Sequence, residues 1–242
     1  PISRWYTMYL TSSDNCRSWS RPKELVPGDV GGRGPVRNKA IILSNGWLLA
    51  PASSEDFLWS MFADISKDNG RTWAASERQN IFHQGETAAT WYNRLLDRSP
   101  LRKKRGVIQP TFWESAPGHV HALMRSSEGR IYRAESIDYG QTWSRPEKTE
   151  LPNNNSGIDA VKLPNGHVYL VYNPVDKNWG KRYPISLALS KDDGLSWTKV
   201  TDLEDGCGNS ELSYPCIQYE DGCLYITYTR NRTNISFRIL RP

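Results

Sequence analysis

Apolar and polar side chains alternate over many short runs of this chain, and this pattern predicts β-strands. Segments 59–65 and 185–189 alternate with a period of two residues, as a strand with one buried face does. Turn sequences separate such runs at 127–129, 164–166 and 220–222. After residue 106 the expected strands are 107–113, 119–126, 129–136, 157–163, 166–173, 184–190, 213–219, 223–229 and 234–240. The pattern therefore predicts an all-β protein.

One eight-residue motif, Ser-x-Asp-x-Gly-x-Thr/Ser-Trp, occurs four times between these runs. Its copies begin at Ser12, Ser66, Ser136 and Ser190, with separations of 54, 70 and 54 residues. Each separation is long enough for one four-stranded sheet. The repeat therefore predicts a chain built from similar small sheets.

The residue types of the motif predict a turn that satisfies its own polar groups. The aspartate can accept hydrogen bonds from backbone N–H groups of the turn, and glycine adopts positive φ without a steric penalty. The tryptophan can fold back over the hairpin. In the first copy Cys16 replaces the glycine, so we expect a strained or slightly different turn there.

This motif is the Asp-box of the sialidase superfamily, and the chain resembles the BNR-repeat, sialidase-like proteins of bacteria, fungi and plants. The resemblance covers nearly the whole chain, including segments 34–39, 107–115, 118–121, 151–157 and 213–215. It implies one β-propeller domain over residues 1–242, made of four-stranded antiparallel blades. Strand counting gives about four to five blades, three full and two partial, where family members have six or seven. Either upstream blades are missing, or the N-terminal strands pair with the C-terminal unit and close a smaller ring.

Composition and charge narrow the possible partners. Ten Trp, twelve Tyr, eighteen Gly and fifteen Pro suit short strands and tight turns. The net charge of +5 is spread along the chain except at 102–105, where a basic run could bind a polyanion, be processed or form a solvated loop. No nucleic-acid-binding motif accompanies the charge, and no apolar stretch reaches the length of a membrane span. We expect neither nucleic acid nor membrane as a partner.

The cysteines and glycosylation sequences bear on chemistry and location. Cys16, Cys207, Cys216 and Cys223 lack the spacing of a zinc site, although one disulfide among the last three is conceivable. We expect no metal and no cofactor. Asn-x-Ser/Thr sequences at Asn154, Asn231 and Asn234 permit glycosylation of a secreted protein, and a secreted location is favoured over the cytoplasm. The oligomeric state stays open.

Candidate binding residues lie at the same position in each expected blade, the end that faces the ligand. Ligands of propellers bind at one end of the central channel, beside the starts of the innermost strands and the ends of the second strands. The candidates at these positions are Arg37, Asn38, Gln109, Trp113, Glu114, His119, His121, Arg125, Asn154, Asn155, Glu211, Tyr214, Tyr228 and Arg230.

The resemblance favours a sialidase-like exo-glycosidase acting on a glycan that bears an acidic sugar. Sialidases clamp the sugar carboxylate with arginines and use a tyrosine nucleophile beside a glutamate. The resemblance makes Arg37, Arg125 and Arg230 candidate clamp residues. It offers Tyr214 or Tyr228, with Glu211 or Glu114, as the nucleophile pair. The family's acid/base aspartate and first arginine normally come from early blades, which we expect this chain to lack.

Two other functions use the same residues. A lectin would stack sugars on Trp113, Trp179 or Tyr214 without catalysis. A uronate lyase would neutralise a carboxylate with Arg125 or Asn154 and abstract a proton with a tyrosine or with one of two histidines. Those two, His119 and His121, share a strand face, but two histidines without a third ligand nearby do not predict a metal site. All three functions imply a carbohydrate partner.

Overall fold

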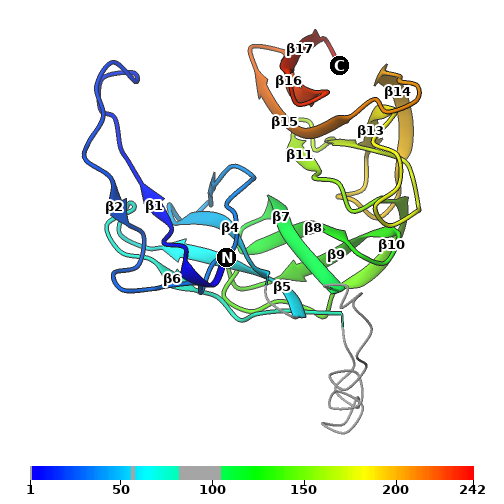
Figure 1. Cartoon of the computed structure of the whole chain (residues 1–242). Coiled ribbons are helices and arrows are strands. Elements are labelled where there is room, and N and C mark those ends of the chain that lie inside the picture. Colours follow the sequence, from blue (N-terminus) through cyan, green and yellow to red (C-terminus); the bar gives the residue numbers. More distant parts are fainter. Residues whose placement is uncertain (1, 56–57, 82–104) are drawn as a thin grey trace, which may run out of the picture.

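The computed structural model describes residues 2–55, 58–81 and 105–242. Apart from one short 3-10 helix, η1 (Ile2–Arg4), the regular elements in these ranges are strands. Figure 1 shows the sheets following one another in chain order along an open arc, with the first and last sheets at its two ends. The all-β prediction is confirmed.

The described strands form three complete four-stranded antiparallel blades, of which the first two are joined into one eight-stranded sheet. Blade 1 consists of β3 (Ile41–Ile42), β4 (Leu48–Glu55), β5 (Leu58–Ser66) and β6 (Ala74–Ala75). Blade 2 consists of β7 (Arg105–Ala116), β8 (His119–Ser126), β9 (Arg130–Ser136) and β10 (Glu147–Pro152). Blade 3 consists of β11 (Asp159–Lys162), β12 (Val168–Tyr172), β13 (Ile185–Ser190) and β14 (Thr198–Glu204).

Blades 1 and 2 also touch along a short parallel pairing of β5 with β7, through Leu58–Arg105 and Trp59–Gly106. Gly106 has a φ of +136°, and a Cβ there would lie 2.2 Å from the Trp59 carbonyl oxygen. Only glycine allows the two backbones to approach this closely.

Two incomplete sheets complete the described chain. The N-terminal hairpin pairs β1 (Met8–Tyr9) with β2 (Lys23–Glu24), and the C-terminal sheet contains β15 (Leu212–Glu220), β16 (Cys223–Arg230) and β17 (Asn234–Leu240). The count of three full and two partial blades is confirmed. The described strands of these two sheets do not pair with each other, so the alternative of a smaller closed ring is wrong for this structure.

The hydrophobic core lies between consecutive sheets. Because side chains alternate along a strand, β8 contributes to two core clusters: Met124 packs with Met61 of blade 1, whereas Leu123 packs with Leu170 of blade 3. A third cluster joins blade 3 to the C-terminal sheet and includes Leu187 and Ile226. β8 is therefore buried on both faces, with blade 1 on one side and blade 3 on the other.

The four Asp-boxes form the same hydrogen-bonded turn. In the third copy Ser136 donates to Asp138 at 2.7 Å, and the same carboxylate accepts from the Thr142 backbone N–H at 2.9 Å. Each box precedes the outermost strand of its sheet, the first lying between β1 and β2. In that copy the backbone N–H of Cys16 donates to the Ser12 hydroxyl at 2.9 Å, and Cys16 has a φ of 63°. Its turn therefore has the same hydrogen bonds as the others, with a non-glycine residue in the left-handed region.

The structure also places the remaining surface features. All four cysteines are free thiols, so no disulfide forms among them. Asn154 is buried and its amide nitrogen donates to the Lys181 carbonyl at 2.6 Å, so this sequon is closed to glycosylation in the folded chain. Of the basic run 102–105 only Arg105 lies inside the described residues. No helix in the described ranges has the length and apolar character needed to cross a membrane.

Candidate functional site

Backbone irregularities coincide at one end of the inner strands. Gln109 in β7 and Tyr214 in β15 both have positive φ, 54° and 53°, each sits at a register shift, and each precedes a proline. Asn155 before β11 and Trp179 before β13 also have positive φ. Such conformations are costly for non-glycine residues and often mark functional sites. They bring polar side chains of three sheets to the same place, the arginine–tyrosine site described below.

Arg125, at the end of β8, forms one side of this site. Its side chain is 5% exposed; Nε donates to the Asn155 side chain at 3.0 Å and Nη1 to Gln109 at 3.0 Å. Gln109 in turn donates to Glu55 at 3.0 Å. Burial lowers the pKa of Arg125, while Tyr214 and Glu55 act in the opposite direction. Arg125 is thus a buried cation held in one orientation.

Arg182 forms the opposite side, on the connection between β12 and β13. It donates to Glu211 at 2.8 Å, and its guanidinium carbon lies 5.3 Å from the centre of the Tyr214 ring. Arg232 binds the second carboxylate oxygen of Glu211 at 2.8 Å, and Ser213 donates to the first at 3.0 Å. Burial raises the pKa of Glu211, but these bonds outweigh it and lower the pKa. Glu211 is therefore an ionised anchor for two arginines.

Tyr214 is 41% exposed, and the guanidinium carbons of Arg182 and Arg37 lie 5.3 and 5.7 Å from the centre of its ring. Burial raises the pKa of its hydroxyl, but hydrogen bonding to Arg182 and the charges of Arg182, Arg125 and Arg232 outweigh it, so the pKa is lowered. An open hollow of about 460 Å³ adjoins the ring. Its lining residues are Tyr214, Thr229, Arg232, Thr233, Asn234 and Ile235. Tyr214 is thus an accessible phenol with an increased tendency to ionise.

Arg37 and Asn38 lie beside the site but are engaged in joining sheets. Arg37 donates to the carbonyls of Ile158 at 2.9 Å and Pro215 at 2.6 Å, and burial lowers its pKa to about 10. Asn38 donates to the carbonyls of Gln109 and Pro110. Asn154 is likewise held by the bond to Lys181 described above. These three predicted substrate contacts support the backbone around the site.

The predicted catalytic histidines lie at the other end of β8. His119 and His121 precede Arg125 by six and four residues, and a strand rises about 3.3 Å per residue, so His119 is about 20 Å away. His121 is buried and stacks on Trp113, with ring centres 5.3 Å apart. Burial, with the charge of His119 next, lowers the pKa of His121 to about 4. The structure therefore separates the histidine pair and Trp113 from Tyr214.

Three further predicted residues also point elsewhere. Glu114 accepts hydrogen bonds from Ser44 and from the Gly118 backbone near the far end of β7. Tyr228 and Arg230 share a face of β16 and both bind Glu204, at 2.7 and 2.6 Å. Their neighbour on the opposite face, Thr229, is the β16 residue that lines the hollow. Strand alternation turns Tyr228 and Arg230 toward Glu204 of blade 3.

The comparisons with known proteins fit this architecture. The family model of the BNR repeat-like domain matches residues 2–226. The chain belongs to this family. No curated protein matches the chain.

Solved structures similar to this BNR repeat-like chain include sialidases. NanB sialidase from Streptococcus pneumoniae has a TM-score of 0.71 at 18% identity, covering 96% of this chain and 34% of NanB. Trypanosoma rangeli sialidase with the inhibitor DANA has a TM-score of 0.59 at 17% identity, with coverage of 97% and 37%. A Dyadobacter fermentans protein of unknown function has a TM-score of 0.67 at 21% identity, with coverage of 96% and 62%. The fold is that of a sialidase-like propeller, and the chain spans about a third of the sialidases' length.

Sequence reasoning missed three charged residues of the site. Glu55 ends β4, Arg182 lies in a long connection and Arg232 lies in the β16–β17 turn. The polar run Ser53-Ser54-Glu55 at the end of an otherwise apolar strand was one available signal. No sequence signal marked Arg182 and Arg232, because a residue in a connection has no periodic pattern that predicts where its side chain points.

Proposed function

We propose that the arginine–tyrosine site binds the acidic sugar of a glycan and acts as a sialidase-like exo-glycosidase. The observation that carries the proposal is the contact of the Tyr214 ring with the guanidinium of Arg182, together with the pKa of Tyr214, which Arg182 and Arg125 lower. Guanidinium groups match the geometry of a sugar carboxylate. A tyrosine with a lowered pKa suits attack on the anomeric carbon. In this proposal Arg125 and Arg182 hold the carboxylate and Tyr214 is the nucleophile. Its oxygen bonds to the anomeric carbon as the glycosidic bond breaks, the aglycone oxygen takes a proton from solvent, and water then hydrolyses the bond between sugar and tyrosine.

Glu211 has a positioning role in this proposal rather than that of a base. Its carboxylate oxygens accept hydrogen bonds from Arg182 and Arg232. A carboxylate engaged in two such charge-assisted bonds is a weak proton acceptor. Glu211 therefore orients Arg182 toward the sugar. The arginines, rather than Glu211, lower the pKa of Tyr214.

Lectin activity is the second candidate, and Trp179 favours it. Its side chain is 62% exposed, and its backbone N–H is anchored on the Asn154 carbonyl at 3.1 Å. An exposed, anchored indole near Asn155 and Arg125 could stack on a sugar face. A lyase using His119 or His121 as base loses its support because those residues lie far from Arg125, which leaves Tyr214 as the base that such a reaction would need.

The test uses a fluorogenic sialoside, a uronate polysaccharide and a glycan array with the full chain. Release of the fluorophore that is lost in Tyr214→Phe and Arg125→Gln, and retained in Tyr225→Phe, supports the glycosidase. Tyr225 is a suitable control because it packs on Phe237 with ring centres 6.3 Å apart. Array binding without release supports the lectin, and absorbance from an unsaturated uronate supports the lyase. Absence of all three signals, or insensitivity to both site variants, contradicts the proposed site.

A further inference from the structure

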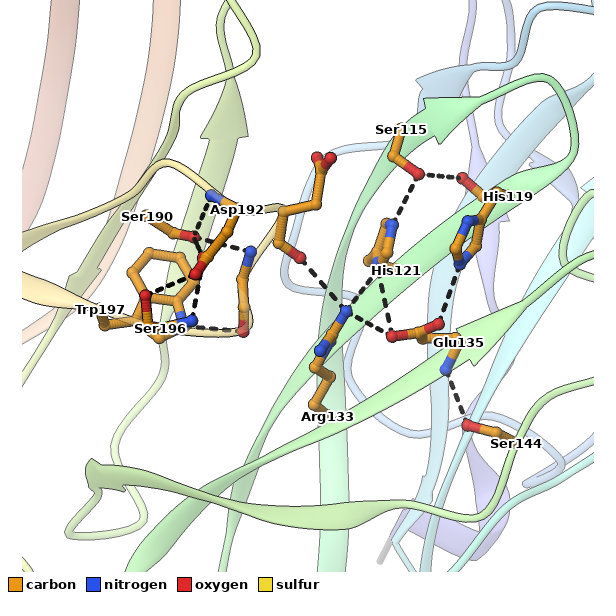
Figure 2. Close-up of polar contacts among 12 residues, drawn as sticks. Ser115, His119, His121, Arg133, Glu135, Ser144, Ser190, Asp192, Ser196 and Trp197 are labelled. Carbon is orange, nitrogen blue, oxygen red and sulfur yellow. Dashed lines mark hydrogen bonds and ion pairs between the residues drawn. The ribbon is translucent and has the colours of Figure 1, made fainter.

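A second polar cluster lies at the Asp-box end of blade 2, far from the arginine–tyrosine site. His119, His121 and Glu135 place one potential ligand atom each within 4.8 Å of one another. Glu135 is the cross-strand partner of His121 in the β8–β9 ladder, and His119 lies two residues away on the same face. Figure 2 shows the three side chains converging from the two strands. The strand pairing itself therefore assembles the cluster.

The three groups match the chemistry of a transition-metal site. Two imidazoles and one carboxylate are a ligand set that zinc uses, with a fourth position open to water. His119 Nε2 lies 2.9 Å from one Glu135 oxygen, and His121 Nδ1 lies 3.7 Å from the other. Ligands at about 2.1 Å from a tetrahedral ion are about 3.4 Å apart. Small side-chain rotations would bring the three atoms to this spacing.

Neighbouring groups orient His121 for binding. Arg133, which can only donate, contacts His121 Nδ1 at 3.1 Å, so this atom carries the lone pair. The proton is then on Nε2, which lies 2.7 Å from the Ser115 hydroxyl. A hydrogen bond from the non-ligating nitrogen is the usual support of a metal-binding histidine. His119 and Glu135 are 37% and 34% exposed, so solvent reaches the cluster, while His121 is 3% exposed.

Arg133 occupies the position that a cation would take. Its guanidinium contacts Glu135 as well as His121, and it also donates to the Asp193 carbonyl of blade 3 at 3.3 Å. The Nε of Arg133 is buried without a hydrogen-bond partner. A bound divalent ion would replace the guanidinium charge between the same ligands. Arg133 would then keep its contact with Asp193 of the last Asp-box. Figure 2 shows this box, with Ser190 and Asp192 labelled, beside the cluster.

We propose that His119, His121 and Glu135 form a binding site for a divalent transition-metal ion of the zinc type, with Arg133 as its competitor. All three ligands belong to blade 2, and the competitor reaches the turn of blade 3. Metal binding would therefore displace Arg133 from the cluster, while its contact with blade 3 remains. The inference is independent of the proposed glycosidase, because no residue is shared with the arginine–tyrosine site.

The test is titration of the full, tag-free chain with Zn²⁺ by calorimetry and with Co²⁺ by visible absorption. We expect one ion per chain and the intense absorption of tetrahedral cobalt. Binding should weaken more than about tenfold in His119→Asn and in Glu135→Gln, because each loses a ligand. Arg133→Gln should bind more tightly than the unmodified chain, because the competing charge is gone. A merely structural cluster would not show this gain.

Two controls keep the result specific. His167→Asn removes a partly exposed histidine whose ring contacts Asn165, outside the cluster, and should leave binding unchanged. Thiolate-to-cobalt charge-transfer bands would place the ion on a cysteine and overturn the proposal. So would the absence of binding at millimolar zinc, or equal binding by the unmodified chain and a His119→Asn/Glu135→Gln double variant with an unchanged melting curve.

Discussion

The guanidinium of Arg182 lies over the ring of Tyr214, 5.3 Å from its centre, although the two residues belong to different sheets. Hydrogen bonding and charge from Arg182 are the leading causes that lower the pKa of Tyr214 against its burial. Arg182→Gln should therefore raise the pKa of Tyr214. Ultraviolet titration of tyrosinate, taken as a difference against Tyr214→Phe, measures it. Arg71→Gln, which removes an exposed cation of the second Asp-box, is the control and should leave the titration unchanged.

The close approach of blades 1 and 2 makes Gly106 sensitive to substitution. In Gly106→Ala the new Cβ would meet the Trp59 carbonyl oxygen, so we expect a loss of about 3 kcal/mol or more in the free energy of unfolding. Gly166→Ala is the matched control: its φ is +87° but the added Cβ meets nothing within 4 Å. It should lose only about 1 kcal/mol, from backbone conformation. Chemical denaturation measures both, and equal losses would contradict the packing argument.

The Asp-box turns should contribute stability and leave ligand binding unaffected. Asp138→Ala removes the carboxylate that accepts bonds from Ser136 and Thr142 and should lower the free energy of unfolding by about 1–3 kcal/mol. Glu150→Ala, an exposed residue of the same blade, should change it by less than about 0.5 kcal/mol. Sugar binding by the folded Asp138→Ala variant should match the unmodified chain. A selective loss of binding would place the box in the site.

The same turns should make the fold sensitive to acid. Hydrogen bonds from the side chain and backbone of Ser196 lower the pKa of Asp192 from 3.8 to about 2. A carboxyl with a lowered folded-state pKa stabilises the fold above its unfolded pKa, and this contribution is lost as the pH falls from about 4 to about 2. Asp192→Asn should therefore be less stable than the unmodified chain at pH 5, with the difference shrinking toward pH 2. A constant difference in denaturation midpoint would contradict this assignment.

Local sequence chemistry was enough to predict the blades. Each Asp-box closes through contacts within eight residues, so its serine, aspartate and glycine specify the turn wherever it occurs. Alternation gave β8, β13 and β17 almost residue for residue. The open arc was harder to predict, because ring closure depends on contacts between distant sheets that no local pattern encodes.

The site could be predicted only in part. Gln109, Asn155 and Tyr214 were recognisable because each stands at the start of an innermost strand. The direction of an arginine was not: Arg37 donates to backbone carbonyls, and Arg230 turns toward Glu204. The histidine pair shares a strand face as expected, with ring centres 4.4 Å apart. The distance between the histidine pair and Arg125 follows from the length of the strand. The pairing of His121 with Glu135 depends on the register of β8 and β9, which the sequence alone does not determine.

The self-contained Asp-box also bears on how such a chain could have evolved. The turn brings its own hydrogen bonds, and in the third and fourth copies its glycine packs on the preceding sheet, Gly140 on Leu49 and Gly194 on Trp113. A duplicated gene segment encoding one sheet would thus encode both the hydrogen bonds that close its turn and the glycine that packs on the preceding sheet. Lineages could lengthen or shorten the array by whole units, while loops at the opposite end diverged under selection for new ligands.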